Sequence, residues 1–194
     1  MKRDKKAAET IARVTLRLLE KEGPQAVTMR RVARAAGITP MAIYHHFPGR
    51  AALLKTVTEA EFEKLRNFAE ARPTPRSFES QIVHIVDGYL DYAFARPRLF
   101  DYVFSRPRTD ARRFPEDFRA RRSPTLNPLA DAVAEGMQKG KLKTDDVWEV
   151  ALELWAHAHG YIMLYRGGRF SLSEKQFRQL VHRSLRRLLY GLKA

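Results

Sequence analysis

The spacing of apolar residues predicts an all-α protein. Apolar side chains recur every three to four positions, as expected for helices with one buried face, along residues about 4–22, 50–71, 76–95, 125–139, 144–166 and from Ser173 to the C-terminus. A short helix is expected after Pro97, and a helical turn is expected around residues 116–121 within an arginine- and proline-rich loop at 105–124. No segment alternates apolar and polar residues as a strand would.

The breaks between these segments predict how the chain is organised. Gly23-Pro24 ends the first helix, and Pro73-Thr74-Pro75 marks a hinge after the long helix at 50–71. Thr144 with Asp145-Asp146 is expected to cap the helix that follows, and Ser173 to begin the last one. We therefore predict an N-terminal domain of residues 1–49 and a helical-bundle domain of residues 50–194, joined by the 50–71 helix.

Residues Thr28 to Leu54 contain two short helices separated by a tight turn. Thr28 is a suitable N-cap, Gly37 is placed to end the first helix, and Thr39-Pro40 restarts the chain as a helix to about His46. A helix, a glycine turn and a short helix with polar tips form the helix-turn-helix pattern.

Charge and composition narrow the partners. The 194 residues carry a formal net charge of +14 and no cysteine. Residues 1–50 alone hold eleven Lys or Arg and four Asp or Glu, which favours a nucleic-acid partner over a membrane surface. The lack of cysteine excludes disulfides and thiol catalysis and fits a reducing cytoplasm. We find no apolar run long enough to span a membrane and no export signal.

Within the helix-turn-helix, the residue types suggest separate roles. Side chains near the start of the second helix meet base edges in such motifs, so Thr39, Met41 and His45, with Pro40 opening that helix, are candidate readers. Thr28 and Arg50 stand at helix N-termini, where anions are favoured, and are candidate phosphate contacts. The alternative for the two threonines is that they act only as caps. The outer-face arginines Arg30, Arg31 and Arg34 attract phosphate or simply face solvent.

This stretch resembles the DNA-binding domain of TetR-type transcriptional regulators. The residues that carry the resemblance are Thr28, Val32-Ala33, Ala36-Gly37-Ile38, Tyr44, His46-Phe47, Arg50 and Leu53. The resemblance implies that Tyr44 contacts backbone phosphate and that Phe47 belongs to the domain core. It also implies a homodimer that binds double-stranded operator DNA, formed through the last two helices (about 144–192). Those helices carry more apolar surface than one domain covers easily.

The C-terminal helices carry many aromatic residues, which suggests a pocket for a small, mostly apolar molecule. Candidate pocket residues are Tyr89, Phe100, Phe104, Trp155, His159 and Tyr161. Trp155, His159 and Gly160 resemble a Trp-x3-His-Gly pattern of one TetR-like branch, and Trp155 and His159 are spaced to stack on one helix face. Burial in a plain core is the alternative. No cofactor is expected, and no metal, because neither His45-His46 nor His157 and His159 have metal-binding spacing.

These features favour a ligand-responsive DNA-binding regulator, most simply a cytoplasmic repressor that an apolar or aromatic ligand releases. A nucleoid-type architectural DNA-binding protein without an effector is the alternative. An enzyme or carrier is a third class, but no catalytic constellation can be assembled from the sequence.

Overall fold

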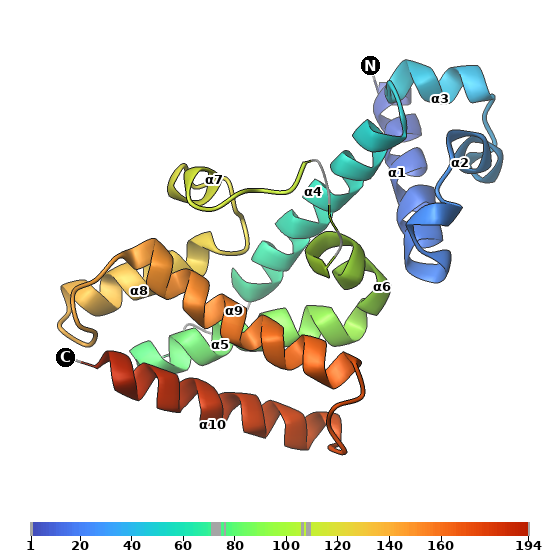
Figure 1. Cartoon of the computed structure of the whole chain (residues 1–194). Coiled ribbons are helices and arrows are strands. Elements are labelled where there is room, and N and C mark those ends of the chain that lie inside the picture. The colour runs from blue at the N-terminus through green and yellow to red at the C-terminus, as the bar shows by residue number, and fades with distance from the viewer. Residues whose placement is uncertain (1, 71–74, 76, 106, 108–109, 194) are drawn as a thin grey trace. The chain divides into compact units, whose positions relative to one another are not determined.

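The computed structural model describes residues 2–70, 75, 77–105, 107 and 110–193, and these residues are helical or irregular, without a strand (Figure 1). The all-α prediction is therefore confirmed. The helices are α1 (Lys2–Glu22), α2 (Met29–Ala36), α3 (Pro40–His46), α4 (Arg50–Glu70), α5 (Phe78–Ala95), α6 (Pro97–Phe100), α7 (Glu116–Arg119), α8 (Asn127–Gln138), α9 (Val147–Arg166) and α10 (Glu174–Leu192). A 3-10 turn, η1 (Pro24–Ala26), follows α1, and a π-helical turn, η2 (Asp101–Ser105), follows α6.

The chain divides into two compact units. The first comprises Met1–Lys64 and Phe94–Ala111, and the second Leu65–Ala93 and Arg112–Ala194. In the first unit, α1 packs against α2, α3 and α6. Its fully buried core includes Ile11, Leu19, Val32, Ile43 and Leu53, which come from α1 to α4. The apolar stripes of these amphipathic helices meet there, and this packing fixes the helix-turn-helix.

In the second unit, α9 packs against both α8 and α10 (Figure 1). Leu90 of α5, Leu154 and Ile162 of α9, and Phe177 and Val181 of α10 are buried in its core. Polar pairs also join α5 to α10: His182 Nε2 lies 2.6 Å from Asp87 Oδ1, and Arg178 Nη1 lies 2.8 Å from Asp91 Oδ1. Among the described residues, no helix is long and apolar enough to cross a membrane.

The structure adds detail to three of the sequence predictions. Of the three residues expected to cap α9, Asp146 forms the cap, and its carboxylate accepts from the amides of Trp148 and Glu149. The short helix expected after Pro97 is confirmed as α6, which continues directly as η2 up to the expected loop. The predicted turn near residue 116 is confirmed as α7. Pro73 and Thr74 of the predicted hinge, and residues 106, 108 and 109 of the arginine-rich loop, lie outside the described residues.

Candidate nucleic-acid interface and interior cavity

Side-chain caps begin both helices of the helix-turn-helix. Thr28 Oγ1 accepts from the Arg31 amide and Thr39 Oγ1 accepts from the Ala42 amide, each at 3.2 Å. Gly37 ends α2 in the left-handed conformation with φ 69°, which a residue with a Cβ adopts only with strain. The predicted capping roles of both threonines are thus confirmed. Capping uses the hydroxyl oxygens as acceptors and leaves both hydroxyl hydrogens available to an anion.

The outer face of α3 presents unusually large apolar side chains to solvent. Met41 is 80% exposed and Tyr44 is 51% exposed, and His45 beside them is also exposed. The opposite face of α3 is buried through Ile43, and Phe47 directly after the helix is buried as predicted. An exposed Met and Tyr on one short helix contribute little to the stability of the isolated unit. They are therefore candidates for contact with a partner.

Arg50 has a structural role that the sequence did not suggest. Its guanidinium donates to the Val27 carbonyl oxygen at 2.7 Å and to the Pro24 carbonyl oxygen at 2.6 Å. These bonds hold the start of α4 against η1, directly before the Thr28 cap. A phosphate contact by Arg50 would have to use the remaining N–H groups of the guanidinium, and it stays a prediction.

The arginines of α2 differ from one another in their surroundings. Arg31 Nη2 binds Glu22 of α1 at 2.6 Å, so its charge is partly compensated within the unit. Arg30 and Arg34 are exposed, as Pro40 and Thr39 are at the start of α3.

His45 and His46 contact each other edge to face, with ring centroids 5.3 Å apart. Within the described part of the chain, no cluster of three or more His, Cys, Asp or Glu side chains is placed to hold a metal ion.

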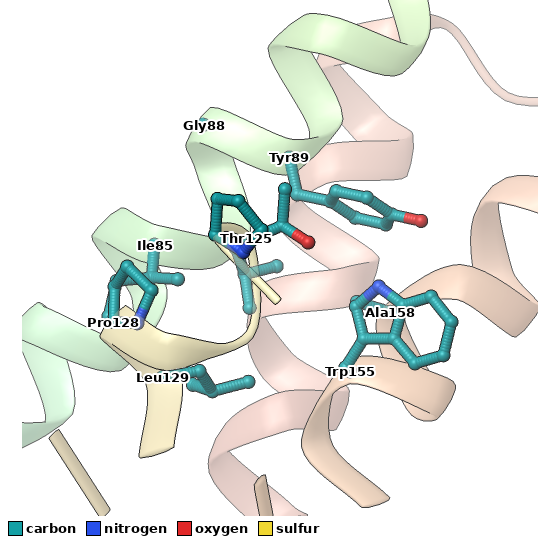
Figure 2. Close-up of a pocket in the computed structure, with 10 residues that line it drawn as sticks. Ile85, Gly88, Tyr89, Thr125, Pro128, Leu129, Trp155 and Ala158 are labelled. Atoms are coloured by element: carbon teal, nitrogen blue, oxygen red, sulfur yellow. The ribbon is translucent and has the colours of Figure 1, made fainter. Parts of the chain in front are cut away.

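The second unit contains a small apolar cavity between α5, α8, α9 and the segment before α8 (Figure 2). Its enclosed part has a volume of about 50 Å³, and it opens to solvent on one side. The lining residues are Ile85, Val86, Gly88, Tyr89, Pro124, Thr125, Pro128, Leu129, Trp155 and Ala158. Of the six candidate pocket residues, Tyr89 and Trp155 line this cavity.

A hydrogen-bonded aromatic cluster forms one wall of the cavity. The Tyr89 hydroxyl lies 2.9 Å from His159 Nδ1, and the His159 ring stacks on Trp155 with centroids 5.3 Å apart and planes inclined by 26°. The stacking predicted from the i,i+4 spacing is thus confirmed. Burial raises the pKa of Tyr89 well above its usual value, against a smaller opposing effect of a hydrogen bond with the Trp155 side chain. Burial lowers the pKa of His159, so the imidazole is neutral at pH 7.

The other candidate pocket residues have different neighbours. Phe100 and Phe104 lie in the first unit, where Phe104 contacts both Phe100 and Phe62 of α4. Tyr161 donates a hydrogen bond to Ser184 of α10 and stacks on Phe170. The sequence did not indicate the cavity residues Gly88 and Thr125. A glycine in the middle of an otherwise apolar helix is the signal that could have indicated Gly88.

A second group of exposed apolar side chains lies on the last two helices. Met163 and Leu164 of α9 are 38% and 50% exposed, and Tyr190 of α10 is 77% exposed. Together with Met41 and Tyr44 they are the large apolar residues that face solvent in the described structure. Exposed apolar side chains thus occur on α3 and on the α9–α10 pair, the elements for which the sequence predicted partners.

Comparison with known proteins agrees with these features. The family described as "Bacterial regulatory proteins, tetR family" matches residues 11–57, and "Tetracyclin repressor-like, C-terminal domain" matches residues 82–188. The HTH-type transcriptional regulator BetI of Rhizobium meliloti (strain 1021) is 34% identical over 74 residues, which cover 36% of this chain and 36% of BetI. The match thus spans about a third of that relative's length.

Two solved structures share the whole fold. A protein of unknown function from Rhodococcus sp. RHA1 has a TM-score of 0.80 at 22% identity, covering 97% of this chain and 96% of that one. The transcriptional regulator FadR of Bacillus subtilis, solved in complex with stearoyl-CoA, has a TM-score of 0.70 at 14% identity, covering 95% and 98%. At these identities the likeness shows the fold.

Proposed function

The chain belongs to the TetR family of bacterial transcription regulators, and we propose that it is a homodimeric repressor that a small, mostly apolar ligand releases from operator DNA. Family membership places the chain among DNA-binding transcription regulators rather than enzymes. In this proposal residues 1–49 bind double-stranded DNA, and residues 50–194 bind the ligand and form the dimer, as the sequence suggested.

The exposed face of α3 carries the DNA-binding part of the proposal. Met41 and Tyr44 project from a helix whose start is capped by Thr39, so both side chains are held at defined positions on the surface. A methionine suits contact with a thymine methyl group, and a phenol hydroxyl suits a backbone phosphate. Thr39, Met41 and His45 would then read bases, whereas Thr28, Tyr44 and Arg50 would position the protein.

The exposed apolar residues of α9 and α10 support the dimer. A second copy that covered Met163, Leu164 and Tyr190 would remove their apolar surface from water, which stabilises association. A two-fold dimer of this kind presents two α3 helices to half-sites about one DNA turn apart. We therefore expect the operator to be a palindrome.

For release, we propose a population shift in which the ligand favours a conformation with lower operator affinity. The chain passes between the two compact units within α4, within α5 and again between residues 111 and 112. Of these connections, α4 begins directly after the helix-turn-helix, so in this proposal α4 carries a change in the second unit to that motif. The FadR structure with stearoyl-CoA shows that a protein of this fold binds a small molecule, but it does not indicate which molecule this chain binds.

Selection of bound sequences from a random DNA pool tests the proposal first. A specific repressor enriches a palindrome, whereas an architectural protein enriches nothing and shows only a steep dependence of affinity on salt. Enrichment without symmetry, or sedimentation of the full chain as a monomer, would contradict the dimeric arrangement.

Variants of α3 then test the assigned roles on the selected operator. Tyr44→Phe keeps the ring and removes the hydroxyl, so it should weaken binding by a similar factor on all sequences. Met41→Ala should change the preference at one base pair by about 1–3 kcal/mol and leave other positions unchanged. If Met41→Ala and Tyr44→Phe both bind the operator like the unmodified protein, α3 is not the reading helix.

A further inference from the structure

We propose that the cavity between α5, α8 and α9 is a binding site for an uncharged single-ring molecule with one hydrogen-bonding group. The binding site stands on its own geometry, whereas its effect on DNA binding rests on the proposed function.

The lining favours uncharged ligands. Among its ten side chains there is no Asp, Glu, Lys, Arg or His, and its polar groups are the hydroxyls of Tyr89 and Thr125 and the indole N–H of Trp155. An ionised carboxylate or phosphate held against this lining would lose hydration without gaining a countercharge, which weakens its binding. The site therefore favours a neutral molecule over its ionised analogue.

The shape of the lining favours a flat ring. Figure 2 shows the rings of Tyr89 and Trp155 on one side, and Ile85, Pro128 and Leu129 on the other. The bond between Tyr89 and His159 holds the Tyr89 ring in place, and the stacked His159 does the same for Trp155. Aromatic and aliphatic walls that face each other suit a planar apolar group, which contacts both faces at once.

The dimensions limit the ligand to about one ring. The enclosed volume of about 50 Å³ is a third of the roughly 150 Å³ cavity that holds benzene in another protein. A ring must therefore lie partly in the open mouth of the cavity or displace part of the wall. The segment around Pro124 and Thr125 is the part of the wall that belongs to no helix. A long acyl chain exceeds this space.

Thr125 supplies the polar anchor. Its hydroxyl has no hydrogen-bond partner in the described part of the chain, although the residue is half-buried against the cavity. A ligand hydroxyl or carbonyl that met Thr125 would satisfy this group and would fix the orientation of the ring. The Tyr89 hydroxyl is already engaged with His159, so it acts mainly in shaping the wall.

Gly88 offers a direct way to fill the site. A Cβ added at Gly88 meets no atom within 4 Å, so an alanine methyl would project into open space of the cavity. Alanine is also a better helix former than glycine. Gly88→Ala should therefore keep or raise the stability of the fold while it removes space for a ligand.

The experiment uses phenol as the neutral probe and benzoate as the charged probe of equal ring size. Binding to the full chain is followed by Trp fluorescence, since Trp155 lines the site, and by the shift in melting temperature. We expect phenol to bind and benzoate not to bind. Gly88→Ala should weaken phenol binding about tenfold or more. The control is Gly191→Ala, because Gly191 is also a helical glycine with open space around it, and this variant should bind phenol like the unmodified protein.

Thr125→Val tests the anchor, because valine has the shape of threonine without the hydroxyl. It should weaken binding of phenol and leave the weaker binding of toluene unchanged. Three results would each overturn the inference: no binding of phenol, equal binding of phenol and benzoate, or Gly88→Ala that binds phenol like the unmodified protein.

Operator affinity is measured separately with and without phenol. If phenol binds as described but operator affinity does not change, the site stands and the proposed release mechanism fails. If the operator is bound specifically but phenol is not bound at all, the regulator stands and the inference about the site fails.

Discussion

Replacement of Arg96 by methionine should destabilise the first unit by about 2 kcal/mol. Arg96 is the first residue after α5, and its Nη1 lies 2.6 Å from Glu20 Oε1 of α1 and 2.9 Å from Glu61 Oε2 of α4. One guanidinium therefore joins α1 and α4 to the start of α6. Glu61 is only 3% exposed, so its carboxylate depends on bonds within the protein.

The magnitude follows from the burial of the groups. Removing one partner of a fully buried ion pair costs about 3–5 kcal/mol, because the other charge stays buried without compensation. Here Arg96 is 35% exposed and Lys64 still binds Glu61 at 2.5 Å, so about half of that cost is expected. Glu20 is also 35% exposed, and Glu20→Gln should cost only about 0.5 kcal/mol.

Urea unfolding of the full chain at fixed protein concentration measures these differences. In the double variant Arg96→Met with Glu61→Leu, most of the lost stability should return, because no buried charge then remains. Two results would show that the buried Glu61 carboxylate does not depend on Arg96. In one, Arg96→Met costs no more stability than Glu20→Gln; in the other, the double variant is less stable than Arg96→Met alone.

Two further predictions concern stability. Gly136→Ala should destabilise the second unit by about 1–3 kcal/mol, because the added Cβ would lie 2.6 Å from the Phe78 ring. Urea unfolding should show this loss as a lower midpoint, and a variant of equal or higher stability would contradict this packing. Burial lowers the pKa of His157 and His159 from 6.5, so below about pH 6.5 the unfolded chain binds more protons than the folded chain. The free energy of unfolding should therefore decrease as the pH is lowered through this range. The free energy of unfolding, measured across this pH range, should decrease less steeply in His159→Asn than in the unmodified protein. An equal slope in both proteins would exclude His159 as a contributor.

The helix-turn-helix could be predicted almost residue by residue. Thr28, Gly37 and Thr39 were assigned from sequence, and each has the predicted capping geometry. Such caps join residues three or four positions apart, so the local sequence contains both partners of each bond. Phe47 is buried in the core, as the family resemblance implied.

The surroundings of the functional side chains were harder to predict. Arg50 donates to carbonyl oxygens 23 and 26 residues before it in the sequence, a structural role that no local pattern indicated, while its phosphate contact stays a prediction. The aromatic residues of the later helices looked alike in sequence, yet Tyr89 lines a cavity and Tyr161 binds Ser184. Periodicity shows that a residue is buried, but it does not show which atoms surround it.

The sequence by itself thus determined the helices, their caps and the family, because periodicity and capping act over one or two turns. Only the tertiary structure decided which residues meet across the fold. The bond between Tyr89 and His159 joins positions 70 residues apart, and the same Gly→Ala change has open space at Gly88 but meets an aromatic ring at Gly136. Such contacts depend on how whole helices pack, and no local pattern records that arrangement.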